Sequence, residues 1–250
     1  MAADSQRFDR YLSRHYAHLG DQARYRARRK RQLLHTYEHV LPESRDAELL
    51  ELGPGYGQWL EALRVDRGYA HAMAVDLSAE VVDFCNRVMP GSTTLVTDTT
   101  GYLRHQAGRF DRVFAFHVLE HVPLPELPAL VSAIRGALKP GGLCVVEVPN
   151  MANALTAGAL RYGDLTHEGG FTELSLRQLL ESAGFASVHC FEERLVPGVP
   201  QDLLAMAFRA FVRAWLRLVY RGYQLPVPAV LSPALCASAV APSSAREPAG

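Results

Sequence analysis

The feature that most constrains the fold is a glycine-rich turn, Glu51-Leu-Gly-Pro-Gly-Tyr-Gly57. The turn follows the apolar pair Leu49-Leu50 and leads into residues 58–63, whose composition is typical of a helix. A strand, a glycine turn and a helix in this order bring bare backbone close to a nucleotide-bearing ligand. The turn therefore predicts a layered α/β domain with a ligand site at this point of the chain.

The spacing of the glycines indicates which kind of ligand the turn accepts. A dinucleotide-binding turn has glycines at the first, third and sixth positions of its fingerprint. Here the third glycine, Gly57, comes at the fifth position, and the sixth is Gln58. An acid, Glu51, lies two residues before the first glycine. The spacing therefore differs from that of a dinucleotide-binding turn.

Four further apolar stretches follow the turn, and polar residues lie at or near their ends. They are residues 71–76 with Asp76, residues 94–98 with Asp98, residues 110–121 with His117 and His121, and residues 138–149 before Asn150. Helical patterns between the stretches predict a parallel sheet with right-handed crossovers. Ligands of such sheets bind outside the carboxyl ends of the strands. We therefore expect these polar residues and the glycine turn to gather at one edge.

These pieces, in this order, resemble the core of class I S-adenosylmethionine (SAM) dependent methyltransferases over residues 46–192, in the branch that acts on small molecules. The resemblance depends on the E-x-G-x-G-x-G turn, the two acids and the V-L-E-H sequence of residues 118–121. It implies a Rossmann-like α/β fold with seven strands, the last of them antiparallel. It also implies SAM as the cofactor and methyl transfer as the reaction.

The same resemblance assigns residues to the cofactor. It implies that Asp76 accepts hydrogen bonds from the ribose hydroxyls, that Asp98 lies near the adenine, and that Glu51 lies near the ammonium group. The complete set expected to line the cofactor is Glu51, Gly53, Gly55, Gly57, Asp76, Leu77, Asp98, Thr99 and His117.

Methylation of a neutral hydroxyl also requires that the hydroxyl lose a proton, so a general base is expected. His167 is the first candidate, because it lies in a polar loop with Asp164 and Glu168 available to orient it. His121 is the second candidate. The histidines, cysteines and acids show no metal-ligand spacing, so the prediction is a site without a metal.

The composition of the chain divides it into three parts. Residues 1–45 are rich in tyrosine and arginine and are expected to form a helical cap. Residues 46–241 form the predicted methyltransferase domain, with helical insertions at 150–170 and 197–230. Residues 242–250 are expected to be a disordered tail. A basic run at residues 26–31 is either a solvated helix face or an anion-binding arm.

The second insertion contains a long apolar helix at residues 202–223. Its arginines at positions 209, 213, 217 and 221 recur every four residues and share one face. Three interpretations are open: a helix packed on the domain, a helix that lies on a membrane surface, and a homodimer surface.

Composition and charge limit the remaining functions. The net charge is zero by formal count, so no overall field attracts nucleic acid. The four cysteines are scattered, which is typical of a reducing compartment. No signal peptide or membrane-spanning run is present in these residues. A strong preference for arginine over lysine suggests a bacterial source, and the protein is expected in the cytoplasm, with contact at the inner face of the membrane through residues 202–223.

The sequence around His167 also bears on the acceptor. The pattern R-Y-G-D-x-T-H-E at residues 161–168, with the helix that follows, resembles methyltransferases of bacterial polysaccharide and glycolipid assembly. The resemblance implies O-methylation of a sugar hydroxyl. The alternatives are a phenolic or quinone O-methyltransferase, a tRNA-modifying enzyme and a non-catalytic SAM-binding scaffold. Zero net charge argues against tRNA, and the intact acids at 51, 76 and 98 argue against loss of cofactor binding.

Overall fold

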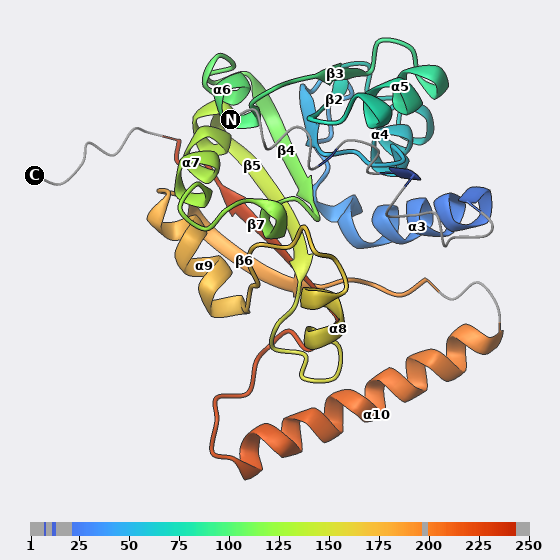
Figure 1. The fold of residues 1–250 in the computed structure, drawn as a ribbon, viewed down its shortest axis with the longest axis vertical. Coiled ribbons are helices and arrows are strands. Elements are labelled where there is room, and N and C mark those ends of the chain that lie inside the picture. The colour runs from blue at the N-terminus through green and yellow to red at the C-terminus, as the bar shows by residue number, and fades with distance from the viewer. Residues whose placement is uncertain (1–7, 9–11, 14–21, 197–199, 244–250) are drawn as a thin grey trace, which may run out of the picture.

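The computed structural model describes residues 8, 12–13, 22–196 and 200–243. Seven strands form one sheet with the order β3-β2-β1-β4-β5-β7-β6 (Figure 1). The pairs from β3 through β5 are parallel, and β7 is antiparallel to both β5 and β6. The predicted seven-stranded α/β sheet with its last strand antiparallel is thereby confirmed.

The strands agree with the apolar stretches of the sequence. Their bounds are β1 Leu49–Leu52, β2 Ala72–Asp76, β3 Thr93–Leu95, β4 Phe110–Phe116, β5 Leu138–Pro149, β6 Ala186–Glu192 and β7 Ala234–Val240. The central strands are apolar on both sides, because helices cover both faces of the sheet.

The helices alternate with the strands. They are α3 Gln22–Tyr37, η1 Glu38–Val40, α4 Gln58–Glu61, η2 Ala62–Asp66, α5 Ala79–Val88, α6 Thr99–Arg104, η3 Leu119–His121, α7 Leu127–Ala137, α8 Ala157–Tyr162, α9 Glu173–Ser182 and α10 Pro200–Gly222. The elements α8 and α10 lie in the two predicted insertions.

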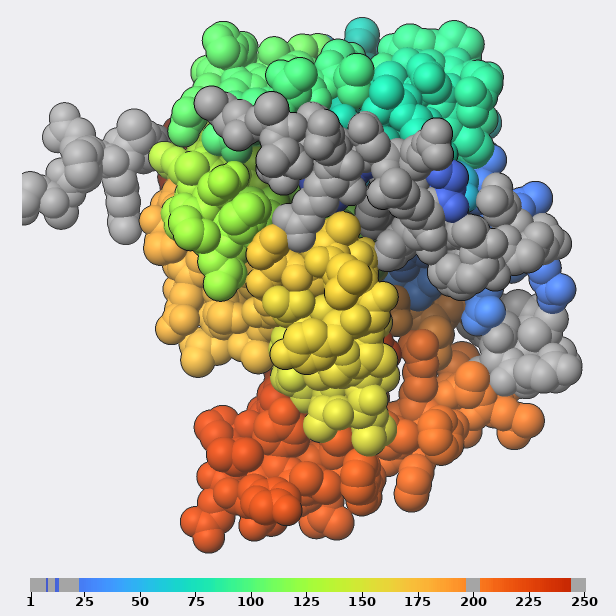
Figure 2. All heavy atoms as spheres, viewed as in Figure 1, coloured from blue at the N-terminus to red at the C-terminus, as the bar shows by residue number. Residues whose placement is uncertain are grey.

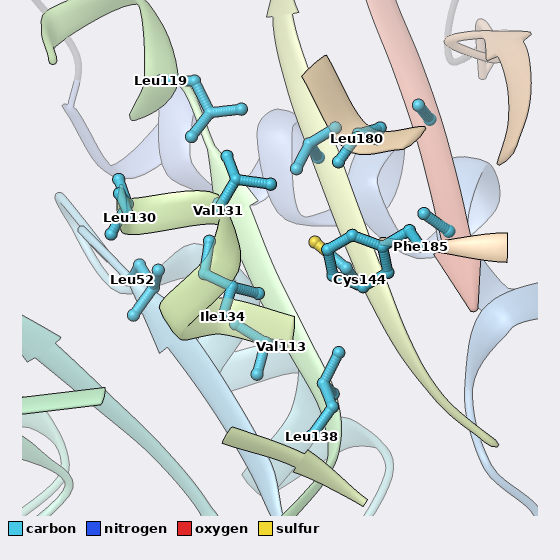
Figure 3. Packing of buried hydrophobic residues seen from close by; sticks show 14 of the residues in the cluster. Leu52, Val113, Leu119, Leu130, Val131, Ile134, Leu138, Cys144, Leu180 and Phe185 are labelled. Atoms are coloured by element: carbon cyan, nitrogen blue, oxygen red, sulfur yellow. The ribbon is translucent and has the colours of Figure 1, made fainter. Parts of the chain in front are cut away.

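Two hydrophobic clusters hold the layers together, one on each face of the sheet. On one face, Val131 and Ile134 of α7 pack with Val113 of β4 and Leu52 of β1 (Figure 3). On the other face, α3 and α4 meet the sheet through aromatic side chains. The rings of Tyr37 and Phe116 stack with their centroids 4.5 Å apart. Burial of such large apolar surfaces is the main stabilising term for a domain of this size.

The basic run on α3 forms ion pairs within the protein. Lys30 and Arg26 bind the carboxylate of Glu61 at 2.8 and 3.0 Å, and Arg29 binds the buried carboxylate of Glu147. Arg26, Arg29 and Lys30 therefore make internal contacts, which neither sequence interpretation included, while Arg28 and Arg31 are exposed, as a solvated helix face requires. Residues 1–7, 9–11 and 14–21 of the predicted cap, and residues 244–250 of the predicted tail, lie outside the described residues.

Helix α10 turns Arg209 and Arg213 toward the sheet and a row of apolar side chains outward. Arg209 contacts Glu193 at 3.4 Å, and Arg213 binds Glu192. The opposite face exposes Phe208 and Phe211, each about two-thirds accessible. The helix forms a separate ridge at the lower end of the molecule (Figure 1, Figure 2). Among the described residues, no helix has the length and apolarity that a membrane span requires.

Candidate functional site

A cavity of about 1100 Å³ opens at the carboxyl ends of the central strands. Most of the predicted site residues meet there. Those that line the cavity are Glu51, Gly53, Gly55, Asp76, Leu77, Asp98, Thr99, His117, His121 and His167. Two predicted residues do not line it: Gly57 caps the N-terminus of α4, and Asp164 lies behind His167.

The glycine turn forms one wall of this cavity and requires glycine for steric reasons. Gly53, Gly55 and Gly57 have φ angles of 64°, 55° and 68°, in the left-handed region that other residues rarely adopt. A Cβ atom at Gly53 would also lie 3.0 Å from the Val118 side chain. The turn therefore leaves bare backbone facing the cavity.

Glu51 is a buried acid with an unused oxygen. Its side chain is 3% exposed, and its Oε2 has no hydrogen-bond partner among the described residues. Burial raises the pKa of Glu51 to about 8, partly offset by a backbone hydrogen bond from Leu60, while the nearby Asp76 raises it further. A buried carboxyl of this kind fits a ligand that brings its own positive charge.

Asp76 ends β2 beside the same cavity. Its Oδ1 accepts a hydrogen bond from the Ser78 backbone at 2.7 Å, which fixes the orientation of the carboxylate. Burial raises the pKa of Asp76 to about 7, although backbone hydrogen bonds from Ser78 and Leu77 oppose the shift. Asp98 follows β3 and comes immediately before α6, on the same rim of the cavity.

Replacing Glu51 with glutamine should make the ligand-free protein less sensitive to alkali. Because the pKa of Glu51 is higher in the folded protein than its ordinary value of 4.5, folding binds a proton, and stability falls as the pH rises from about 4.5 to 8. The E51Q protein lacks this loss, so its free energy of unfolding at pH 9 should exceed that of the wild type by roughly 1–3 kcal/mol. Urea denaturation at pH 5 and pH 9 measures the difference. If the free energy of unfolding fell equally in both proteins between pH 5 and pH 9, the raised pKa of Glu51 would be contradicted.

His117 is held between two carboxylates at the end of β4. Its Nδ1 donates to Glu120 at 3.0 Å and its Nε2 donates to Glu147 at 2.9 Å, so both ring nitrogens carry protons. Burial alone would lower the pKa of His117, but these two hydrogen bonds outweigh it and raise the pKa to about 10. The ring is 45% exposed because it faces the cavity. His117 is therefore a fixed cation on the cavity wall and cannot accept a proton at neutral pH.

The partner of His117, Glu147, also anchors the N-terminal helix. Arg29 and the Tyr37 hydroxyl, both from α3, donate to the Glu147 carboxylate, the latter at 2.5 Å. Burial would raise the pKa of Glu147, but Arg29, His117 and Tyr37 hold it far below its ordinary value. The sequence analysis missed Arg29, Tyr37 and Glu147. Glu147 is the single acid in the apolar stretch at residues 143–148, and this feature could have indicated a buried charge with partners elsewhere in the chain.

The two remaining histidines lie side by side. The ring centroids of His121 and His167 are 4.7 Å apart. The Thr166 hydroxyl lies 2.9 Å from His121 Nδ1 and donates to Asp164 Oδ1 at 2.7 Å. The Asp164 Oδ2 atom is 3.8 Å from His167 Nε2, an electrostatic contact rather than a hydrogen bond. Asp164 therefore lies close to His167 and is linked to His121 through the Thr166 hydroxyl.

Backbone hydrogen bonds fix the loop that carries His167. The N–H groups of Glu168 and Gly169 donate to the Glu120 carbonyl at 2.7 and 3.1 Å. The Arg161 guanidinium donates to the carbonyls of His167 and Glu168 at 2.7 and 2.9 Å. The position of the His167 ring is thus determined by the first insertion and the loop after β4 together.

One ligand atom each from Glu120, His121 and His167 lies within 4.8 Å of the others. No local spacing indicates this group, because the fold brings His167 to the other two residues from a distant part of the chain. Histidine and carboxylate ligands at such separations suit a divalent ion after small side-chain adjustments. The prediction of a site without a metal therefore stays a prediction, and elemental analysis of the purified protein tests it.

Comparison with known proteins identifies the chemistry of this cavity. Residues 23–190 match a family described as a methyltransferase domain. The chain belongs to this methyltransferase family. The match spans the glycine turn, both acids of the cavity rim and the loop that carries His167. The methyltransferase uses SAM as its cofactor and transfers a methyl group to a small-molecule substrate.

Solved structures support the fold of the methyltransferase. A SAM-dependent methyltransferase from Archaeoglobus fulgidus is 21% identical, with a TM-score of 0.63, over 86% of this chain and 94% of that chain. A Thermotoga maritima protein described as a possible histamine N-methyltransferase is 13% identical, with a TM-score of 0.65, over 95% and 99% of the two chains. A search of curated proteins found no match.

A third structure contains the cofactor. Phosphoethanolamine N-methyltransferase 2 from Haemonchus contortus, in complex with SAM, is 17% identical, with a TM-score of 0.56, over 85% of this chain and 52% of that chain. In the methyltransferase described here, the unpartnered Glu51 oxygen and the bare glycine turn fit a cationic, nucleoside-bearing cofactor. The residues that would hold it are the glycine turn, Glu51, Asp76 and Asp98.

Proposed function

We propose that this methyltransferase methylates a sugar hydroxyl of a glycan or glycolipid and that His167 acts as the general base. The observation that carries the proposal is a histidine on the cofactor cavity wall whose Nδ1 has no hydrogen-bond partner among the described residues. Because Asp164 lies 3.8 Å from Nε2, the tautomer with its proton on Nε2 is favoured. The lone pair of Nδ1 is then without a partner among the described residues, but the atom is buried, so we propose that the ring turns toward the cavity when the acceptor binds.

The residues of the site have different roles in the proposed reaction. Bound SAM supplies a methyl group activated by a positively charged sulfur. His167 Nδ1 takes the proton of the acceptor hydroxyl, and the nearby Asp164 carboxylate stabilises the imidazolium that results. His117 is already a cation and takes no part in proton removal. The cavity walls would orient the acceptor toward the bound cofactor, and such positioning is the larger part of catalysis for a displacement of this kind.

His121 is the second candidate for the base. Burial lowers the pKa of His121, so its ring is neutral at pH 7 and able to accept a proton. The Thr166 hydroxyl lies between Asp164 and His121, whereas the Asp164 Oδ2 atom is 3.8 Å from His167 Nε2. This difference favours His167 as the base and His121 as the residue that positions it.

One observation favours a second acceptor class. The cavity wall includes the aromatic side chains of Tyr25, Trp59 and Phe116, against which a phenolic or quinone-type ring can pack. The tRNA alternative loses its support, because Arg26, Arg29 and Lys30 of the basic run form internal ion pairs. Incubating the protein with methyl-labelled SAM and separate lipid, glycan, phenolic and tRNA fractions tests the proposal. Label in the phenolic or tRNA fraction alone would reject the sugar acceptor.

A lipid-linked acceptor gives a role to the exposed face of α10. Leu204, Phe208, Phe211, Trp215 and Leu218 recur at alternating steps of four and three residues, so they share one face of the helix. Side chains of this kind insert at the boundary between lipid headgroups and acyl chains. We therefore place the protein, as a proposal, in a bacterial cytoplasm with α10 on the inner face of the membrane.

Replacing Leu204, Phe208 and Phe211 with glutamine should reduce binding to phospholipid vesicles by at least about tenfold, because the variant loses the apolar area that enters the membrane. Vesicle sedimentation measures the loss. The matched control replaces Val65 and Leu174, which are similarly exposed on other elements. If both variants sedimented equally with the vesicles, the membrane role would be contradicted. If instead the triple variant changed from dimer to monomer, the apolar face of α10 would be a homodimer surface.

A further inference from the structure

A second cavity, of about 1090 Å³, lies between α10, β6 and the end of α3. Among the titratable residues that line this cavity, basic side chains outnumber acidic ones. The described titratable residues that line it are His35, His39, His189, Glu192, Glu193, Arg194, Arg209, Arg213 and Arg217. With the histidines neutral, these nine residues carry four positive charges and two negative charges.

The two acidic residues of this cavity already form ion pairs with arginines of α10. Glu193 contacts Arg209 and Glu192 binds Arg213. Among the described residues, no carboxylate forms an ion pair with Arg194 or Arg217. Two guanidinium groups therefore face the cavity without a counter-charge from this part of the protein.

Aromatic contacts order the histidines beside these arginines. The Phe191 ring meets the His39 ring edge-on at 5.1 Å and stacks with the His189 ring at 5.9 Å. Burial lowers the pKa of His39 and the positive charge of Arg194 lowers it further, although a backbone hydrogen bond with Thr36 opposes the shift. The local potential is thus positive, and a bound anion would lower the electrostatic energy of the whole group.

The second cavity shares a wall with the cofactor cavity. Gln32 lines the cofactor cavity, and its side-chain amide donates to Glu193 Oε2, on the wall of the second cavity, at 2.7 Å. One turn further along α3, His35 lines the second cavity. The two cavities are therefore neighbours, separated by the contact between Gln32 and Glu193.

We propose that the second cavity binds the phosphate or diphosphate group of the acceptor, with Arg194 and Arg217 as its main ligands. Guanidinium groups bind phosphate oxygens through paired, charge-assisted hydrogen bonds, which suits an anion of this class. The identity of the anion as part of the acceptor rests on the proposed function. The anion site itself does not, because it requires neither SAM nor methyl transfer.

Calorimetric titration of the full-length protein with inorganic pyrophosphate tests the site. The R194Q/R217Q variant should bind pyrophosphate at least about tenfold more weakly than the wild type. The control is R221Q, which removes an arginine from the same helix outside the lining of this cavity. Absence of saturable binding to the wild type, or equal affinity in wild type and double variant, would overturn the proposal.

Two further measurements identify the source of the phosphate. Sedimentation with phosphatidylcholine vesicles, with and without phosphatidic acid, should show a weaker response to the acidic lipid in R194Q/R217Q if the ligand is lipid-linked. If only the pyrophosphate titration changes, the ligand is soluble. Methyl transfer to a sugar phosphate should show a higher KM and an unchanged kcat in the double variant. Pyrophosphate binding without any transfer to sugars would reject the proposed function and leave this site in place.

Discussion

Replacing His167 with alanine should lower kcat by about 10²–10⁴-fold, the usual contribution of a general base. His167 lies on the cavity wall with an unpartnered Nδ1, and its Nε2 lies 3.8 Å from the Asp164 carboxylate. The dissociation constant for SAM should change little, because the glycine turn and the acids that would hold the cofactor are untouched. Steady-state kinetics with an identified acceptor and calorimetry with SAM measure the two effects separately.

A matched histidine variant controls this experiment. His71→Ala removes an exposed histidine from the loop before β2, away from the described cavity lining, and should leave kcat unchanged. If H167A keeps full activity and His121→Ala loses it, the base is His121.

Replacing Asp76 with alanine should raise the dissociation constant for SAM by about 100-fold or more. A carboxylate that accepts hydrogen bonds from two ribose hydroxyls contributes roughly 1.5–3 kcal/mol for each bond. The structure holds this carboxylate at the end of β2, on the cavity rim, with its Oδ1 fixed by the Ser78 backbone. Isothermal calorimetry with SAM measures the loss.

The control for this prediction is Asp83→Ala, which removes an exposed acid from α5. It should bind SAM like the wild type. Because the pKa of Asp76 is about 7 in the ligand-free protein and the hydroxyl donors favour its ionised form, SAM affinity should increase from pH 6 to pH 8. The increase should be smaller in D76N. Unchanged affinity in D76A would remove Asp76 from the cofactor site.

The elements of the fold could be predicted from local sequence. The glycine turn follows a strand and begins a helix because only glycine adopts its three left-handed conformations without strain. Helix α9 begins where Thr172 and Ser175 cap each other, at 2.9 and 3.3 Å, and Gly184 follows its end with a φ of 88°. Each of these signals depends on residues within a few positions of one another.

The gathering of the cofactor residues could also be predicted, since parallel strands place their carboxyl ends at one edge of a sheet. The charges of the site residues could not be predicted from the sequence. His117 looked like an ordinary lining residue, and its fixed positive charge depends on Glu147, which lies 30 positions further along the chain. Arg29 reaches the same carboxylate across 118 positions. No local pattern encodes such pairs.

The direction in which α10 faces shows the same division. The four-residue spacing of the arginines determined that one helix face is basic and another apolar. Only the tertiary structure decided that the basic face meets Glu192 and Glu193 and that the apolar face stays exposed. Periodicity is a property of neighbouring residues, so the sequence by itself determined the elements, their order and the edge of the sheet at which the predicted site residues gather. The protonation of His117, the pairing of the histidines and the second cavity depend on contacts between distant segments, which form only when the sheet brings those segments together.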